Sequence, residues 1–374
     1  MSSLSRIPSG VQYFFDDEVR RRRYVEHSAM MVFRGWSYDE IILPMFDYQD
    51  LFSRGMGRDK AERTYRFVDR DGSLLALRPE LTSLIARTVA TRFRRKPRPI
   101  RLCYSGEVFR YDEPSQRAAG EFHQLGLEQI GEAGITADLE VLLIAIETLT
   151  SLGLTGFRIA LSHVDFFNGI ASRLEFAEPD RTRLRELIDR RNSQALDHFL
   201  ASHAPQIEEA ERQRLCQLIG LTRGDESLVL AGNLLANRQS LAAVDQLTRI
   251  HETLRQLNLA EHFVIDLGEV AGLDYYTGLT FRIYVPHRGT TIGSGGRYDK
   301  LIGNFGDPEP AVGFSLSLDG LAGALAAQRP DEPWQSVEES ETIEPGDQLS
   351  GAFLRARQLR EQKRKVRIGG DKSR

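Results

Sequence analysis

The chain has 374 residues, 41% of them hydrophobic, and a formal net charge of -4. This length and composition suffice for a large core and roughly two domains, whereas the net negative charge provides no overall field for nucleic acid. The two cysteines are far apart in the sequence and the eight histidines are scattered, which excludes a disulfide framework and the common metal motifs.

The same features predict the compartment. Two thiols without a partner nearby in the sequence fit a reducing cytoplasm. The longest aliphatic run, residues 141–146, is too short to cross a bilayer, and residues 1–10 lack the apolar core of a signal peptide. We therefore expect a cytoplasmic protein, and no motif in the chain indicates a metal or a cofactor.

Three helices are predicted in the first half of the chain. The first has an acidic first turn and ends at Gly35. The second lies in LRPELTSLIARTVA, with Pro79 at its first position and Glu80 in its first turn, where the helix dipole favours a carboxylate. The third begins at Thr136 and ends at Gly153.

Residues 101–131 predict two strands joined by a long polar loop. In the second strand, alternation places Gln124, Gly126 and Glu128 on one face. Gly126 would leave a gap about one side chain wide between the other two, suited to a small polar molecule with a positive charge. Arg110 adds a guanidinium for a carboxylate or phosphate. The alternative is that these groups satisfy one another or water.

The second half predicts a helical insertion followed by more strands. Residues 177–260 are charged and helix-periodic, and strand signals return in four segments up to residue 325. Antiparallel strands with helices grouped elsewhere indicate an α+β fold. We expect one domain over residues 1–325 and a polar tail over 326–374, disordered in its first half and with one basic helix in its second.

The motifs, taken in order from about Gly10 to Leu325, resemble the class II aminoacyl-tRNA synthetase catalytic domain of the histidyl-tRNA synthetase lineage. RGWSYDEIILPMFDYQDLF is similar to motif 1, whose proline, here Pro44, lies at the homodimer interface of that family. GEVFRYDEPSQRAAGEFHQLGLEQIG is similar to motif 2, GLDYYTG to the histidine-recognition loop and AVGFSLSLDGL to motif 3. The resemblance implies an antiparallel sheet flanked by helices.

The resemblance also implies a histidine pocket. Gln124 and Glu128 match the residues that hold the side chain and amino group of histidine, and Arg110 matches the arginine at its carboxylate. The full set of matching positions is Glu80, Thr82, Arg110, Gln124, Glu128, Tyr275 and Tyr276.

Two positions depart from the synthetase pattern. Ala271 stands where the recognition loop has an arginine used in adenylate formation, and Gly320 stands where motif 3 has the arginine that grips the ATP γ-phosphate. One such arginine can be worth roughly 10³- to 10⁵-fold in phosphoryl transfer, so amino-acid activation should be negligible. Too few residues follow Leu325 for the anticodon-binding domain of a synthetase.

This combination resembles the ATP phosphoribosyltransferase regulatory subunit family, which implies a protein without catalytic activity of its own. The implied partner is a short-form catalytic subunit, activated by assembly and inhibited through the complex by histidine. Histidine could occupy the synthetase-like pocket or the subunit interface. Two alternatives stay open: a truncated synthetase paralogue that activates histidine or another amino acid, and an RNA-binding module using residues 92–101 and the basic tail.

Overall fold

The computed structural model describes residues 7–8, 10–57, 61–111, 120–218, 227–229, 231, 237–269, 275–286, 291–330, 334, 341–343, 349–364 and 366–369. These residues fall into two compact units. The first comprises Met1–Tyr13 and Arg22–Pro330, and the second comprises Phe14–Arg21 and Asp331–Arg374. The predicted domain boundary at residue 325 lies close to the end of the first unit.

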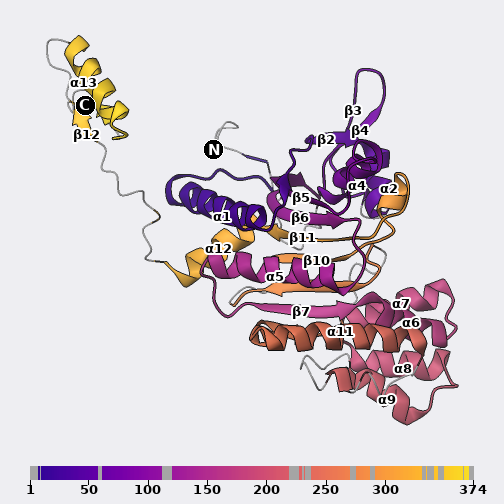
Figure 1. Cartoon of the computed structure of the whole chain (residues 1–374). Helices are drawn as coiled ribbons and strands as arrows, with labels where there is room; N and C mark the ends of the chain where they lie inside the picture. Colours follow the sequence, from indigo (N-terminus) through magenta and orange to yellow (C-terminus); the bar gives the residue numbers. More distant parts are fainter. Residues whose placement is uncertain are drawn as a thin grey trace. The chain divides into compact units, whose positions relative to one another are not determined.

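An eight-stranded sheet organises the first unit (Figure 1). The sheet is antiparallel except at its two edges, where β1 pairs with β5 and β7 pairs with β8 in parallel. Helices and strands are thus segregated, and the α+β prediction is confirmed. In spatial order the strands are β1 (Asp39–Glu40), β5 (Ile100–Phe109), β6 (Glu121–Ile130), β11 (Ala311–Ser317), β10 (Gly293–Arg297), β9 (Leu279–Tyr284), β7 (Arg158–His163) and β8 (Phe263–Ile265).

One face of this sheet is covered by α5 (Ile135–Ser151), by α12 (Leu318–Gln328) and by the part of α1 (Asp16–Gly35) that follows Arg21 (Figure 1). Leu125 and Leu127 of β6 are fully buried on this face. Phe33 of α1 packs edge-on against Phe314 of β11, with ring centroids 5.8 Å apart. The predicted first and third helices are therefore confirmed to within two residues.

The opposite face packs against α4 (Thr82–Thr91), α2 (Gln49–Met56) and a small sheet of β2 (Phe46–Tyr48), β4 (Leu74–Leu77) and β3 (Arg66–Val68). Their core joins Leu84 and Ile85 to Leu102 and Tyr104 of β5. The first position predicted for this helix, Pro79, is wrong, since the helix begins three residues later. The reason is that Glu80 precedes the helix and its carboxylate accepts the Ser83 N–H, at 2.9 and 3.1 Å.

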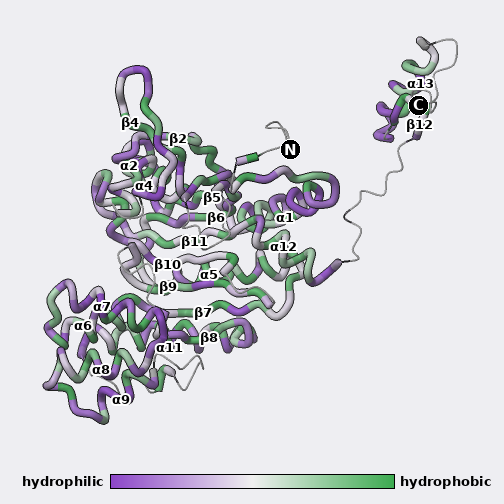
Figure 2. The backbone as a smooth tube through the Cα atoms, turned by 180° about the vertical axis from the view of Figure 1, so that it is seen from behind, coloured by the Kyte–Doolittle hydropathy of each residue, from purple (hydrophilic) through white to green (hydrophobic). Residues whose placement is uncertain are grey.

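Helices fill the predicted insertion: α6 (Val164–Arg173) precedes α7 (Glu178–Asp189), α8 (Ser193–His203), α9 (Glu209–Leu218) and α11 (Arg238–Gln256), and the short η2 (Ala260–His262) follows. Along α7 to α9 hydrophobic and hydrophilic residues alternate, as expected for amphipathic helices (Figure 2). A buried polar network attaches α11 to the sheet. Gln246 donates to Asp138 at 2.8 Å, and Asp138 pairs with Arg297 of β10 at 2.7 Å.

The second unit contains β12 (Glu341–Ile343), α13 (Leu349–Glu361) and β13 (Val366–Ile368). The two strands pair in parallel, and Ile343, Ala352, Ala356 and Leu359 form a small core. The predicted helix is confirmed by α13. The two strands were not predicted, because three residues are too few for a period-2 pattern. Most residues expected to be disordered lie outside the described ranges.

The basic segment Arg92–Arg101 is largely matched by carboxylates. Arg94 pairs with Asp307 at 3.1 Å, Lys96 with Asp39 at 3.4 Å, and Arg98 with Glu309. This pairing reduces the positive field that an RNA contact needs. Among the described residues, no helix is both long enough and apolar enough to cross a membrane.

Candidate functional site

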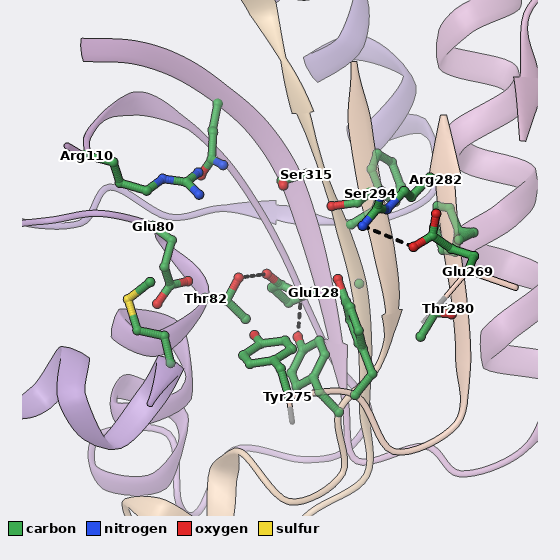
Figure 3. A pocket seen from close by; sticks show the side chains of 17 residues that line it. Glu80, Thr82, Arg110, Glu128, Glu269, Tyr275, Thr280, Arg282, Ser294 and Ser315 are labelled. Atoms are coloured by element: carbon green, nitrogen blue, oxygen red, sulfur yellow. Dashed lines mark hydrogen bonds and ion pairs between the residues drawn. The ribbon is translucent and has the colours of Figure 1, made fainter. Parts of the chain in front are cut away.

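A cavity of about 450 Å³ lies on the sheet face opposite α5 and α12, and it is lined by all seven residues predicted for the histidine pocket (Figure 3). The chain brings them together from four distant segments. Glu80 and Thr82 flank the start of α4, Arg110 follows β5, Gln124 and Glu128 stand on β6, and the two tyrosines precede β9. The predicted residues that line it are Glu80, Thr82, Arg110, Gln124, Glu128, Tyr275 and Tyr276.

The gap predicted at Gly126 is filled, and this part of the prediction is wrong. Tyr104 on β5 is the cross-strand partner of Gly126, and its phenol occupies the space in which a Cβ would stand. The glycine therefore admits a tyrosine from the neighbouring strand. The opening lies instead over β11 and β10, where Ser315 and Ser294 line the cavity.

Glu128 lies at the centre of a hydroxyl cluster. Its side chain is 1% exposed and accepts hydrogen bonds from Thr82 at 2.8 Å, from Tyr104 at 3.3 Å and from Tyr298. Burial is the largest cause that raises the pKa of Glu128 from its ordinary value of 4.5 to about 8. The nearby Glu80 also raises this pKa, whereas the three hydroxyl hydrogen bonds lower it. Near neutral pH the free pocket therefore holds this carboxyl largely protonated.

Arg110 and Glu80 lie together at one end of the cavity (Figure 3). The Arg110 guanidinium stacks over the Phe122 ring, 4.7 Å from its centroid, which fixes its plane. Gln124, 8% exposed, comes from the same strand as Glu128. This end therefore offers donors for a carboxylate and acceptors for an ammonium group.

Sequence reasoning missed the other end of the cavity. Arg282 of β9 forms an ion pair with Glu269 at 3.0 Å, and both side chains line the pocket with Thr280 and Tyr298. Arg282 and Ser294 are cross-strand partners. An alignment of β9 with β10 would have placed Arg282 beside the glycine-rich GSGGRY segment, but strand register is not visible in one sequence.

Gly320 lies at the start of α12, with little room for a side chain. A Cβ there would be 3.1 Å from Ile292 and 3.2 Å from Ser317. The preceding Asp319 pairs with Arg22 and accepts the backbone N–H of His123 at 3.0 Å. This turn is therefore used for packing. The second departing position, Ala271, lies outside the described residues.

Comparisons with known proteins decide the family. The family model for histidyl-tRNA synthetase matches residues 10–321. A relative from Geobacter sulfurreducens, described as an ATP phosphoribosyltransferase regulatory subunit, is 38% identical over 357 residues, which cover 95% of this chain and 80% of that protein. One of the same description from Moorella thermoacetica is 34% identical over 366 residues, 98% of this chain and 92% of that protein.

The chain belongs to the ATP phosphoribosyltransferase regulatory subunit family. A solved structure described as an ATP phosphoribosyltransferase regulatory subunit/histidyl-tRNA synthetase from Bacillus halodurans has a TM-score of 0.88 and 26% identity, covering 100% of this chain and 95% of that one. Histidyl-tRNA synthetase from Nostoc gives a TM-score of 0.80 at 21% identity over 99% of this chain and 87% of that one. The second likeness concerns the fold alone. The predicted family and the predicted synthetase-like fold are both confirmed.

Proposed function

We propose that this chain is the non-catalytic regulatory subunit of an ATP phosphoribosyltransferase. It assembles with a short-form catalytic subunit, activates it in the first step of histidine biosynthesis and transmits inhibition by histidine. The observation that carries the proposal is a cavity that collects all seven residues expected to bind histidine but has only two cations, Arg110 and Arg282, in its lining. We assign histidine to this pocket rather than to a subunit interface.

The charges that line the cavity support binding of an amino acid rather than nucleotide chemistry. Among the lining residues, Arg110 and Arg282 are the cations, and Arg282 is paired with Glu269. Glu80 and Glu269 equal these two arginines in number, since the third lining carboxyl, Glu128, is held largely protonated. A triphosphate needs an excess of positive groups on its oxygens, whereas a zwitterionic amino acid is complementary to a balanced set.

Histidine acts on the assembly by favouring one of two states. A ligand that bound both states equally would shift nothing, however tightly it bound. A difference in binding free energy of about 1–3 kcal/mol is the usual size of such coupling. The pocket therefore has to change shape or exposure between the active and inhibited complexes.

A homodimer through the motif 1 region is supported by exposed apolar side chains on and beside the small sheet. Ile42 is 91% exposed and Val68 67%, which is costly for such side chains in water unless another surface covers them. The group comprises Ile42, Met45, Phe46, Tyr48, Phe67, Val68 and Leu74. A cytoplasmic location fits the free thiols of Cys103 and Cys216.

Co-expression with a short-form phosphoribosyltransferase tests the assembly. We expect one co-eluting species, with transferase activity that depends on this chain and falls when histidine is added. A chain that always elutes alone, beside a transferase that is fully active and histidine-sensitive by itself, would overturn the proposal.

The second candidate, a truncated synthetase paralogue, is favoured by the same pocket residues. ATP–pyrophosphate exchange with histidine on the purified chain discriminates between the two functions. The regulatory proposal predicts no exchange above background, and measurable turnover would make the chain an enzyme.

A further inference from the structure

The floor of the cavity is a row of residues in register across four strands. Gly126 of β6 pairs with Ser315 of β11, Ser315 with Ser294 of β10, and Ser294 with Arg282 of β9. Paired residues share a face of the sheet. Since neighbouring strands lie about 4.8 Å apart, three intervals make the row about 14 Å long.

Only the middle of this floor is open. The phenol of Tyr104 covers Gly126, and the Glu128 carboxylate leans over Gly313 of β11. The two serines, whose side chains are short, are thus left as floor between Glu128 on one side and β9 on the other. About two strand intervals, roughly 10 Å, separate β11 from β9.

The far wall of the cavity is built from an ion pair. Glu269 is 8% exposed and Arg282 is about one third exposed, and they lie 3.0 Å apart. In Figure 3 they stand across the cavity from Arg110 and Glu80. A carboxylate can accept several hydrogen bonds at once, and the guanidinium opposite it fixes its orientation.

We propose that Glu269 selects the side chain of the bound effector, with Arg282 as its positioning residue. This inference rests on the proposed function, which places the amino-acid backbone at the Glu80 end. An imidazole lying over Ser315 and Ser294 would face Glu128 with one edge and Glu269 with the other. One hydrogen bond of about 2.9 Å on each side of the ring fits the interval between the two walls.

The wall therefore favours a side chain that ends in an N–H donor and rejects one that ends in a carboxylate. Two carboxylates at hydrogen-bond distance repel each other, and a side chain without a donor would cover Glu269 without replacing the hydrogen bonds that water gives it. Histidine meets the requirement, whereas histidine methylated at the ring nitrogen farther from its backbone lacks the donor.

Calorimetric titration of the full chain with these two ligands tests the inference. We expect Glu269→Gln to weaken histidine binding at least about fivefold, because a charge-assisted hydrogen bond becomes a neutral one. The wild type should bind the methylated ligand more weakly than it binds histidine. For the methylated ligand, the affinity of Glu269→Gln should be no lower than that of the wild type. Arg282→Lys should retain more histidine affinity than Arg282→Ala, since lysine keeps the charge that orients Glu269.

Glu140→Gln is the matched control. Glu140 is also a mostly buried carboxylate paired with an arginine, Arg101 at 2.9 Å, but it does not line the cavity. It should leave both affinities unchanged. Equal histidine affinity in the wild type and Glu269→Gln, or the same loss for both ligands, would overturn the inference while the proposed function stood. A wild-type chain that binds no histidine would overturn both.

Discussion

Glu128 is the residue on which the chemistry of the pocket depends most. It is buried among three hydroxyl donors, and its pKa is raised to about 8. In the unfolded chain the same carboxyl ionises near its ordinary value of 4.5. The folded state therefore holds a proton that the unfolded state releases between these two values.

Glu128 makes the folded protein less stable as the pH rises. The contribution of Glu128 to stability is fully present below about pH 4.5 and is lost as the pH rises toward 8. The glutamine in Glu128→Gln is neutral at all pH values. Between the two pKa values, we therefore expect this substitution to abolish a decrease in the free energy of unfolding of about 1.4 kcal/mol per pH unit. Denaturant unfolding of both proteins at pH 5.5 and pH 8.5 measures it, and identical pH slopes would contradict the assignment.

Gln124 lines the cavity, and under the proposed function its loss should affect ligand binding rather than the fold. We expect Gln124→Ala to weaken histidine about 10- to 100-fold, the range for one or two hydrogen bonds to charged groups. Calorimetry measures the affinity. Gln129→Ala is the control, because Gln129 is a buried glutamine of the same strand that lies outside the cavity lining. Wild-type affinity in Gln124→Ala would place the effector site elsewhere.

At the scale of elements, the start of α12 is tightly packed around Gly320, the position at which motif 3 of the synthetases has an arginine. Ile292 and Ser317 leave little room beside Gly320. A longer side chain has to displace them, and a positive charge is unfavourable near a helix N-terminus.

We therefore expect Gly320→Arg to destabilise the protein by about 1–2 kcal/mol, in the range of other overpacked positions. It should not restore ATP–pyrophosphate exchange. Thermal unfolding and the exchange assay measure the two effects, and Gly320→Ala serves as a smaller control. A stable Gly320→Arg protein that exchanges pyrophosphate would show that one substitution separates this chain from an enzyme.

The small sheet of β2, β4 and β3 is the element that we expect to hold the homodimer together. Val68→Glu would bury an unpaired charge in that interface, which typically costs several kcal/mol, and should produce monomers in sedimentation velocity. Val229→Glu is the matched control, because Val229 is 66% exposed and Val68 67%. Dimers of unchanged strength in Val68→Glu would place the interface elsewhere.

Some of these elements could be predicted from the sequence and others could not. The hairpin of β5 and β6 and its polar face were predictable, because alternation decides which side chains share a face. The filling of Gly126 by Tyr104 was not, because it depends on the register between two strands. Arg282 and Glu269 were missed for the same reason, since β9 and the segment after β8 meet only in the folded sheet. Pro79 misled the helix start because the carboxylate of Glu80 caps the helix from outside.

At the scale of the whole molecule, a synthetase-like sheet carries a pocket suited to an amino acid, and the cations that phosphoryl transfer requires are few. The first unit holds the entire cavity. Under the proposed function, the chain influences chemistry through a partner, and its ligand acts by changing the assembly.

The most direct test combines the pocket with the partner. Transferase activity is measured in co-purified complexes that contain either the wild-type chain or Gln124→Ala, with histidine titrated into each. We predict that both complexes are active, that histidine inhibits the wild-type complex, and that the Gln124→Ala complex needs at least about tenfold more histidine for the same inhibition. Equal inhibition of the two complexes would contradict the claim that this pocket binds the histidine that inhibits the transferase.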